Sequence, residues 1–348
     1  MTKWKFGIIG SGMIADFHAK AISSLANATI AGVYGTNAEK TRALANKYRC
    51  PQFLTSAELL SSPDIDIVTI ATPSGAHLAP AIEAARNGKH VLCEKPIEIT
   101  LERIDKMIAA HAEAGTYLGG IFNYRYHDSV RHLKRAVDSG RFGTITHASI
   151  QVPWWRNEDY YKGSWHGTWK LDGGGALMNQ AVHMVDLLQY LMGPVESLHA
   201  YIATLGHDIE VEDTATATLR FKNNALGNIY GSTASFPGQF RRLFITGTKG
   251  TVTMLDNSFE NWQFAEEQED DAAIRKQFAN VEGGGGASDP KAIPFEPHAR
   301  NIGAFIEAIE QGRTFEIDGT EARKAIEIVE AIYKSAKENK HVNIVNSR

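Results

Sequence analysis

Four side chains suited to proton transfer occur in two short stretches of the chain. Asn179, His183 and Asp186 have the spacing i, i+4 and i+7, which places an amide, an imidazole and a carboxylate on one face of a predicted helix. A free imidazole has a pKa of about 6.5 and can act as a base near neutral pH. Lys95 stands on a short turn before a proline, where its ammonium group can stabilise charge developing on an oxygen. The set predicts acid–base chemistry on a hydroxyl or carbonyl group.

Each of these residues also has a structural interpretation. A histidine inside an apolar helix is often a hydrogen-bonded core residue, and lysine usually lies on the surface. Under the catalytic interpretation, His183 is the base, Lys95 steadies the oxygen, and Asn179 orients the substrate or His183. Asp186 would fix the imidazole tautomer. A glycine-rich turn at 173–175 leads into the helix, and the pattern at the start of the chain favours catalysis.

The first residues match the dinucleotide-binding pattern G-x-G-x-x-A. A short apolar run at 5–9 is followed by Gly10, Gly12 and Ala15, and a helical pattern continues to about residue 25. Gly10 permits a tight turn, Gly12 lets the backbone approach a pyrophosphate, and Ala15 allows the helix to pack closely on the strand. The helix N-terminus then faces the anion. The alternative is a purely structural glycine turn.

Apolar segments alternate with helical patterns through the first third of the chain. After the glycine turn they cover 29–34, 38–47, 65–70, 77–87, 89–93 and 101–114. This alternation predicts an α/β domain with a doubly wound parallel sheet, the Rossmann arrangement. Ligands of such a sheet lie outside the carboxyl ends of its strands. Two strand ends, Ala71-Thr72-Pro73 and Glu94-Lys95-Pro96, are therefore expected at the cofactor.

The end of the second strand bears on the choice between NAD and NADP. An acidic residue that binds the adenosine ribose is expected there, but the chain has Gly35-Thr36-Asn37. No carboxylate at this point repels a 2'-phosphate, and Thr36, Asn37, Lys40 and Arg42 are candidate donors. The sequence therefore predicts that NADP binds at least as well as NAD.

The second half of the chain has the pattern of a different domain. The division is expected at residue 124, giving a dinucleotide-binding domain, 1–124, and a substrate-binding and oligomerisation domain, 125–348. Apolar residues alternate with period two at 144–152, 197–204, 214–221, 226–235, 243–247 and 251–255. This predicts an α+β domain with an open, mostly antiparallel sheet.

Three further expectations concern this second domain. The small, flat face at 214–218 is expected to contact another copy of the chain and form a dimer or tetramer. Residues 266–297 are expected to form a long mobile insertion, either a lid or a solvated loop. Helices at 298–311 and 320–339 close the chain.

An aromatic loop separates the first strand of this domain from the glycine turn. It runs from residue 153 to 170 and holds four of the six tryptophans, at positions 154, 155, 165 and 169. Aromatic faces with interleaved arginine and lysine suit a sugar ring, which offers C–H groups to the rings and hydroxyls to the charges. The alternative is an oligomer contact, since aromatic residues also mark interfaces.

Together these motifs resemble the glucose-fructose oxidoreductase, inositol dehydrogenase and rhizopine-catabolism family (Gfo/Idh/MocA). The resemblance spans nearly the whole chain, and its most specific part is the segment 88–96, which ends in Glu-Lys-Pro. It implies a Rossmann domain, a C-terminal open-sheet domain, a nicotinamide cofactor and a sugar or cyclitol substrate. Two residues depart from the family pattern. Ser74 stands where many members have asparagine, and Asn179 stands where inositol dehydrogenases have aspartate, which argues against their polyol specificity.

Composition and charge exclude other classes. The chain has 348 residues, a formal net charge of -4 and 43% hydrophobic residues, with no block of Lys or Arg. Neither a nucleic-acid nor a membrane partner is expected. Cys50 and Cys93 lack metal-ligand spacing, so free thiols in a cytoplasmic protein are predicted, and no metal site.

The sequence thus predicts an NAD(P)-dependent oxidoreductase that transfers hydride between its cofactor and a secondary hydroxyl or ketone of a sugar or nucleotide sugar. Sugar and nucleotide-sugar 3-dehydrogenases are the most similar relatives by analogy. Lys95 and His183 are expected to meet in a cleft between the domains. Two other functions stay open: an NAD-dependent glycosidase of related fold that oxidises its sugar transiently, and a non-catalytic cofactor-sensing regulator.

The expected contact residues complete this interpretation. The cofactor is assigned to Gly10, Gly12, Met13, Ile14, Gly35, Thr36, Asn37, Lys40, Ala71, Thr72, Pro73, His77, Glu94, Lys95 and Asn123. The substrate is assigned to Tyr124, Arg125, Trp154, Trp155, Arg156, Tyr160, Trp165, Trp169, Asp172, Asn179 and His183.

Overall fold

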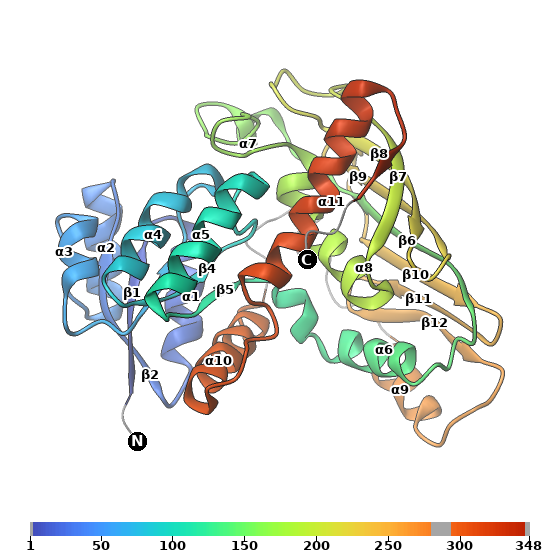
Figure 1. The fold of residues 1–348 in the computed structure, drawn as a ribbon, viewed down its shortest axis with the longest axis horizontal. Coiled ribbons are helices and arrows are strands. Elements are labelled where there is room, and N and C mark those ends of the chain that lie inside the picture. Colours follow the sequence, from blue (N-terminus) through green and yellow to red (C-terminus); the bar gives the residue numbers. More distant parts are fainter. Residues whose placement is uncertain (1–2, 280–293, 345–348) are drawn as a thin grey trace. The chain divides into compact units, whose positions relative to one another are not determined.

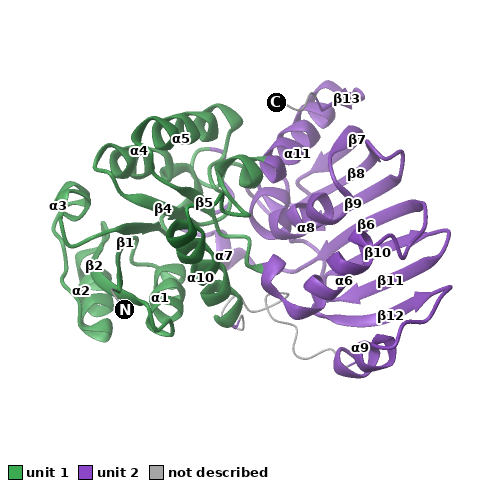
Figure 2. Ribbon diagram, turned by 60° about the horizontal axis from the view of Figure 1, so that its bottom comes forward, with its two compact units in different colours: residues 1–123, 170–173, 295–323 green, residues 124–169, 174–294, 324–348 purple. Residues whose placement is uncertain are grey.

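Two compact units make up the part of the chain that the computed structural model describes, residues 3–279 and 294–344 (Figures 1 and 2). The first unit consists of Met1–Asn123, Lys170–Gly173 and Phe295–Arg323, and the second consists of Tyr124–Trp169, Gly174–Pro294 and Lys324–Arg348. The sequence predicted a single division at residue 124. The chain instead returns to the first unit twice, because the glycine turn and a late helix pack on it.

The first unit contains a five-stranded parallel sheet. Its order is β2-β1-β3-β4-β5, formed by β1 (Trp4–Ile9), β2 (Ala28–Tyr34), β3 (Ile67–Ile70), β4 (His90–Cys93) and β5 (Leu118–Gly120). All four residues of β3 are buried, as expected for a strand covered on both faces. This confirms the predicted doubly wound sheet.

Helices cover both faces of this sheet. They are α1 (Met13–Ser23), α2 (Ala38–Tyr48), α3 (Ser56–Ser61), α4 (Leu78–Arg86), α5 (Leu101–Ala114) and α10 (Glu296–Gln311). α4 packs beside α5, and α1 packs beside α10. The short α3 was not predicted, although a capping box announces it: Thr55 accepts from the Glu58 amide, and Glu58 accepts from the Thr55 amide.

The second unit contains an eight-stranded sheet of order β12-β11-β10-β6-β9-β8-β7-β13. Its strands are β6 (Ile145–Pro153), β7 (Val195–Ala203), β8 (Thr214–Phe221), β9 (Leu226–Ser232), β10 (Arg242–Gly247), β11 (Gly250–Leu255), β12 (Ser258–Phe264) and β13 (Val342–Asn343). Neighbouring strands are antiparallel except β6 and β9, which are parallel. This confirms the predicted mostly antiparallel sheet.

One face of that sheet carries the helices of the second unit. α6 (Asp128–Asp138), α8 (Val182–Met192) and most of α11 (Gly319–Glu338) lie over it (Figure 2). The residues of β8 alternate strictly between the two faces of the sheet. Ala215, Ala217 and Leu219 are buried, whereas Thr216, Thr218 and Arg220 on the opposite face are exposed. The alternation follows from the two-residue period of a strand that is packed on one side only.

The segment expected to be a mobile insertion is partly regular. α9 (Asp271–Gln277) follows β12, and Asp271 is held by two hydrogen bonds from Arg141, at 2.8 and 2.6 Å, and by one from the Trp262 indole. This part of the segment is therefore a helix anchored to its own unit, which the sequence did not predict. Residues 280–293 of the same segment, which was expected to be either a lid or a solvated loop, lie outside the described residues.

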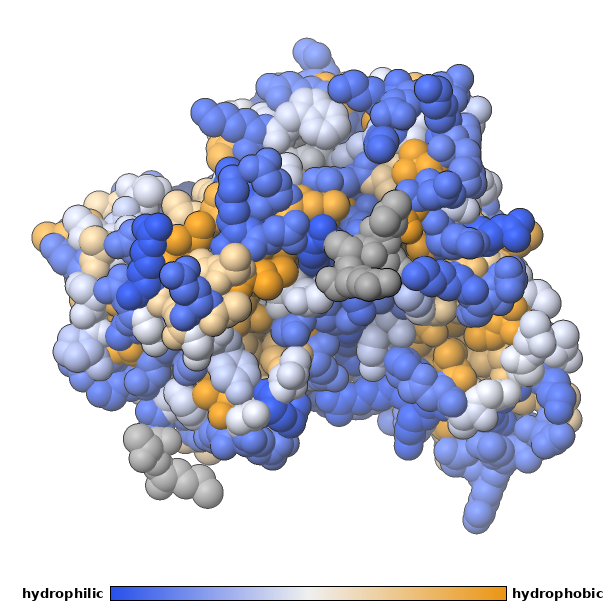
Figure 3. Space-filling model, viewed as in Figure 1, coloured by the Kyte–Doolittle hydropathy of each residue, from blue (hydrophilic) through white to orange (hydrophobic). Residues whose placement is uncertain are grey.

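On the face shown in Figure 3, hydrophobic residues form small separate patches among hydrophilic ones. None of the helices in the described ranges has the length and hydropathy of a membrane span. Both cysteines are free thiols, as predicted.

Candidate functional site

The turn after β1 has the form of a dinucleotide-binding loop. Gly10 has a φ of +128°, and a Cβ there would stand 2.4 Å from the carbonyl oxygen of Ala71. Gly12 is the N-cap of α1, no side chain caps this helix, and a Cβ at Gly12 would meet nothing within 4 Å. Amide groups at the start of α1 therefore face open space, which suits a pyrophosphate. Met13 and Ile14, two predicted cofactor residues, are the first two residues of this helix.

Little space surrounds Gly35 at the end of β2, where the sequence places the adenosine ribose. A Cβ at Gly35 would lie 2.5 Å from the Ser11 hydroxyl and 2.7 Å from that of Thr41. A side chain at this position would require both hydroxyl groups to move. Asn37 caps α2 by accepting from the Lys40 amide at 2.9 Å. Thr36, in the same turn, is exposed.

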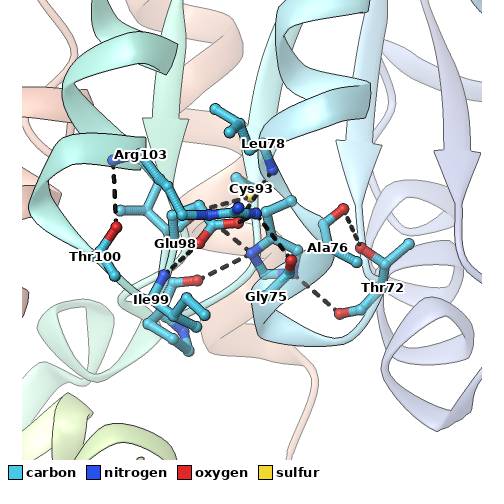
Figure 4. A network of polar contacts seen from close by, with 12 residues as sticks. Thr72, Gly75, Ala76, Leu78, Cys93, Glu98, Ile99, Thr100 and Arg103 are labelled. Carbon is cyan, nitrogen blue, oxygen red and sulfur yellow. Dashed lines mark hydrogen bonds and ion pairs between the residues drawn. The ribbon is translucent and has the colours of Figure 1, made fainter. Parts of the chain in front are cut away.

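The turns after β3 and β4 are fastened to each other (Figure 4). His77 is buried, and its two ring nitrogens lie 3.0 Å from the carbonyl oxygens of Thr72 and Pro96. The buried Glu98 accepts from Arg103 at 2.7 Å and from the Leu78 and Ile99 amides. Arg103 also donates to the carbonyl oxygen of Gly75 (2.9 Å). His77, a predicted cofactor residue, thus links the turn after β3 to the turn after β4.

Glu94, next to Lys95, is the centre of a buried polar cluster. It accepts from His18 at 2.7 Å and from the Lys95 amide at 2.9 Å, and His298 lies 3.6 Å away. Burial alone would raise the pKa of Glu94, but the two histidines outweigh it and hold this pKa well below the usual range. The Asn123 amide nitrogen lies 3.3 Å from Nδ1 of His298. The cluster fixes the backbone at Lys95, which is itself half-buried.

His18, Glu94 and His298 are also residue types that bind metals, and their ligand atoms all lie within 4.8 Å of one another. The 2.7 Å separation of His18 and Glu94 is a hydrogen-bond distance. Two atoms that share a zinc ion at about 2.0–2.1 Å stand more than 3 Å apart. The cluster is therefore a hydrogen-bonded one. His18 and His298 were missed, because they come from helices 280 residues apart in sequence.

In the second unit, the predicted catalytic helix begins differently from the prediction. Residues Ala176–Ala181 form a π-helix, and α8 begins at Val182. Asn179 lies on the wider π turn and His183 on the first turn of α8, so the expected i, i+4 relation of a regular α-helix does not hold. π turns frequently occur at functional sites. His183 is 9% exposed, and its ring stacks on that of Tyr124 with centroids 4.4 Å apart.

Asp186 pairs with a residue that was not predicted as its partner. Its carboxylate accepts from Arg125 at 2.8 and 2.5 Å, and both side chains are almost fully buried. The Arg125 guanidinium also lies 4.3 Å from the ring centre of Tyr190. This buried pair gives Asp186 a structural partner that the sequence did not predict. A buried charge pair of this kind needs both members, since removing one leaves the other uncompensated.

The aromatic loop is attached to the π-helix. The Asn179 amide nitrogen lies 3.2 Å from Nδ1 of His166, and Gln180 donates to the Tyr160 hydroxyl at 3.2 Å. Tyr160 and His166 stack with centroids 4.3 Å apart. The loop also contains the short α7 (Glu158–Tyr161). His166 was not predicted, and its only signal is its place among the aromatic residues.

The four tryptophans of the loop do not form one surface. Trp154 is 5% exposed, whereas Trp169 is 43% exposed and rests on Tyr333. Trp155 meets Phe236 edge to face, and Trp165 lies against His166. A further predicted substrate residue, Asp172, is buried and belongs to the first unit.

Two buried arginines, Arg241 and Arg156, interact electrostatically with Tyr124. Arg241 lies 4.0 Å from the Tyr124 ring centre and pairs with Asp256 at 3.3 Å. Arg156 lies 5.1 Å from the Trp154 ring centre. Burial lowers the pKa of Arg156, and the neighbouring tyrosines only partly offset this effect. An anionic group placed against Arg156 would therefore be strongly favoured.

The fold and these turns define a nicotinamide-dependent oxidoreductase, and comparison with known proteins supports this. Residues 4–120 match the oxidoreductase family with an NAD-binding Rossmann fold, and residues 130–253 match the GFO/IDH/MocA C-terminal domain. The chain is 32% identical to glucose-6-phosphate 3-dehydrogenase of Bacillus subtilis, over 67% of this chain and 69% of that one.

Two solved structures are similar over the whole length. WlbA dehydrogenase of Bordetella pertussis, in complex with NADH and UDP-GlcNAcA, is 34% identical, with a TM-score of 0.92 and 99% of each chain covered. The enzyme of Chromobacterium violaceum, with the same ligands, is 32% identical, with a TM-score of 0.91, and the match covers 100% of this chain and 98% of that one. The chain belongs to the Gfo/Idh/MocA family and is an NAD-binding oxidoreductase.

Proposed function

We propose that this protein is an NAD(P)-dependent dehydrogenase that oxidises the C3 hydroxyl of a UDP-linked N-acetylhexosaminuronic acid such as UDP-GlcNAcA. The observation that carries the proposal is the full-length likeness to two WlbA dehydrogenases that hold NADH and UDP-GlcNAcA. The relative named as a 3-dehydrogenase supports the choice of the C3 carbon. The aromatic loop supports a sugar ring as the substrate.

The residues of the first unit would hold the cofactor. The Gly10–Gly12 turn and the open N-terminus of α1 fit the pyrophosphate, and the linked turns at Thr72 and Lys95 border the strand ends. When bound, the nicotinamide ring accepts a hydride from the carbon that bears the hydroxyl. Lys95 lowers the energy of the oxygen as it loses its proton.

The residues of the second unit would handle the proton and the substrate. His183 takes the hydroxyl proton, and the stacked Tyr124 ring keeps the imidazole in one plane. Asn179 orients the substrate, while its contact with His166 keeps the amide in place. Because Lys95 and His183 are assigned to the same hydroxyl, their catalytic contributions depend on each other.

Arg156 is our candidate for the residue that binds the sugar carboxylate. It is 5% exposed, and burial disfavours its charged form, so a bound carboxylate compensates a cost that the protein already bears. A substrate that has a hydroxymethyl group in place of the carboxylate would not form this ion pair. The site would therefore select uronic acids over neutral sugars.

Three finer features extend the proposal. NADP is expected to bind at least as well as NAD, because no carboxylate near Thr36 repels its 2'-phosphate. The exposed threonine face of β8 is expected to contact a second copy of the chain in a homo-oligomer. The two free thiols suit a reducing cytoplasm.

The decisive experiment is a kinetic comparison of three substrates. Wild-type protein and the Arg156→Gln variant are assayed with UDP-GlcNAcA, UDP-GlcNAc and free GlcNAcA, following NADH absorbance and identifying the product by NMR. We expect a 3-keto product and a kcat/KM for UDP-GlcNAcA at least about tenfold above that for UDP-GlcNAc, a margin that Arg156→Gln reduces by about 1.4 kcal/mol. Release of an aglycone without net NADH, or binding without turnover, would overturn the proposal.

A further inference from the structure

We propose that Glu212 is a positioning residue that holds the π-helix Ala176–Ala181 and so sets where Asn179 and His183 are presented to the substrate. The inference rests on the proposed function, which assigns Asn179 and His183 to the chemistry. Glu212 itself was not singled out from the sequence, and no step of the proposed reaction uses it.

Three successive backbone amides at the start of the π-helix donate to this one residue. The Gly175 amide donates to Oε2 at 2.9 Å, and the Leu177 amide donates to Oε1 at 2.9 Å. Between them, the Ala176 amide donates to the backbone carbonyl oxygen of Glu212 at 3.0 Å. The first amides of a helix have no partner within it and need one from outside. Here one residue, 35 to 37 positions along the chain, supplies all three acceptors.

The carboxylate of Glu212 is itself held in place by a hydrogen bond from another element. Tyr333, on α11, donates its hydroxyl to Oε1 of Glu212 at 3.0 Å. Asp213, the next residue, accepts from the Leu205 and Gly206 amides at 3.0 and 2.6 Å, and its own amide donates to Ala203. Glu212 is 2% exposed, so water does not compete for these bonds. The acceptor is therefore rigid, and a rigid acceptor can fix the direction of the helix.

The glycines of the turn are explained by this arrangement. A Cβ at Gly175 would lie 1.7 Å from the Glu212 carbonyl oxygen, and a Cβ at Gly174 would lie 2.0 Å from the Tyr333 hydroxyl. Neither residue tolerates a side chain, because Glu212 and Tyr333 occupy that space. The glycine run and Glu212 therefore depend on each other, although they lie far apart in the sequence.

The charge state of the carboxyl is consistent with the role. Burial raises the pKa of Glu212 to about 7, and the Leu177 and Gly175 amides and the Tyr333 hydroxyl limit the rise. The titratable group that faces it from α11 is Tyr333, while the π-helix presents backbone amides. Above about pH 7 the ionised carboxylate accepts all of its donors, so kinetic tests of its role belong at about pH 8.

The test compares Glu212→Gln with Tyr333→Phe and with Asp271→Asn. An amide at 212 can accept from only one of the two backbone donors, so kcat should fall at least about tenfold. The affinity for NAD, which the first unit binds, should change less than about twofold. Tyr333→Phe keeps both backbone bonds and should lower kcat about two- to threefold. Asp271→Asn is the matched control, since it removes a buried carboxylate of the same unit that also accepts from a backbone amide and an indole.

Two further measurements separate positioning from general destabilisation. Hydrogen exchange at residues 176–183 should speed up in Glu212→Gln and stay unchanged in Asp271→Asn. In a His183→Ala background, Glu212→Gln should lower kcat little further, because its effect passes through the helix that carries His183. Unchanged exchange and an unchanged kcat in Glu212→Gln would overturn the inference. If His183→Ala alone leaves kcat intact, the proposed function fails, while exchange still decides whether Glu212 holds the helix.

Discussion

The dinucleotide turns of the first unit and the π-helix of the second are held in different ways. The Gly10–Gly12 turn is mostly local: it joins a strand directly to a helix, and Gly12 faces open space, although Gly10 also lies against Ala71. The π-helix depends on Glu212 and Tyr333, which are distant in sequence. A local turn can be recognised by its motif, whereas a turn held from afar cannot. Mutations should therefore separate binding from positioning.

The largest expected effect is on catalysis. His183→Ala should lower kcat by about 10²- to 10⁴-fold with cofactor affinity nearly unchanged, because acid–base help of this size is lost. Lys95→Ala should lower kcat similarly and also weaken cofactor binding. Steady-state kinetics and fluorescence titration measure the two quantities.

The double variant sharpens this prediction. If Lys95 and His183 serve the same hydroxyl, Lys95→Ala/His183→Ala should be little slower than either single variant. Multiplicative losses in the double variant would contradict a shared role.

A pair of glycine substitutions tests the comparison directly. Gly175→Ala forces a Cβ against the backbone of Glu212 and should cost about 1–3 kcal/mol of unfolding free energy, as overpacking does. Gly12→Ala meets no atom within 4 Å and has an ordinary φ of −84°, so its stability should stay within about 0.5 kcal/mol of wild type.

The same two variants should differ in function: Gly12→Ala should affect cofactor binding, and Gly175→Ala should affect kcat. Gly12→Ala should weaken dinucleotide binding, because its Cβ projects into the space for the pyrophosphate. Gly175→Ala should keep cofactor binding and lose kcat. Urea unfolding and cofactor titration on both proteins decide the matter, and equal stability losses at the two sites would refute the distinction between them.

The pH dependence of stability provides a further test. Because burial raises the pKa of Glu212 to about 7, the native state keeps this proton between about pH 4.5 and 7 while the unfolded chain releases it. The group's stabilising contribution is full below about pH 4.5 and is lost as the pH rises through 7. Glu212→Gln lacks this change, so it should be most destabilised relative to wild type at pH 5 and least at pH 8.

The size of that change is about 1.4 kcal/mol for each unit by which the pKa is raised. Urea unfolding at both pH values measures it, and Asp271→Asn provides the contrast. The Arg141 hydrogen bonds hold the pKa of Asp271 below its usual range, so this carboxylate is ionised at both pH values. Asp271→Asn should therefore lose the same free energy of unfolding, relative to wild type, at pH 5 and at pH 8. A constant difference between Glu212→Gln and wild type would show that the carboxyl titrates normally.

The smallest expected effect concerns cofactor choice. Wild-type protein should bind NADP at least as tightly as NAD, and Thr36→Asp should shift the preference toward NAD by about tenfold, or about 1.4 kcal/mol, through repulsion of the 2'-phosphate. Position 36 is used because a side chain at Gly35 would collide with Ser11 and Thr41. A wild-type preference for NAD of tenfold or more would contradict the prediction.

Local patterns alone determined much of this protein. The glycine motif, the buried strands of the first unit and the alternating strands of the second were readable because each depends on neighbours in sequence. The family resemblance also came from short motifs, and the comparisons confirm it. Candidate residues such as Lys95 and His183 could be named because they lie inside those motifs.

Only the tertiary structure decided how these residues are held. Asp186 faces Arg125, the turn at Glu94 depends on His18 and His298, and the π-helix depends on Glu212. None of these partners lies near its target in the sequence, and a buried carboxylate shows no periodicity. A polar group inside a protein must find a hydrogen-bond partner, but which partner it finds is settled only when distant segments pack together.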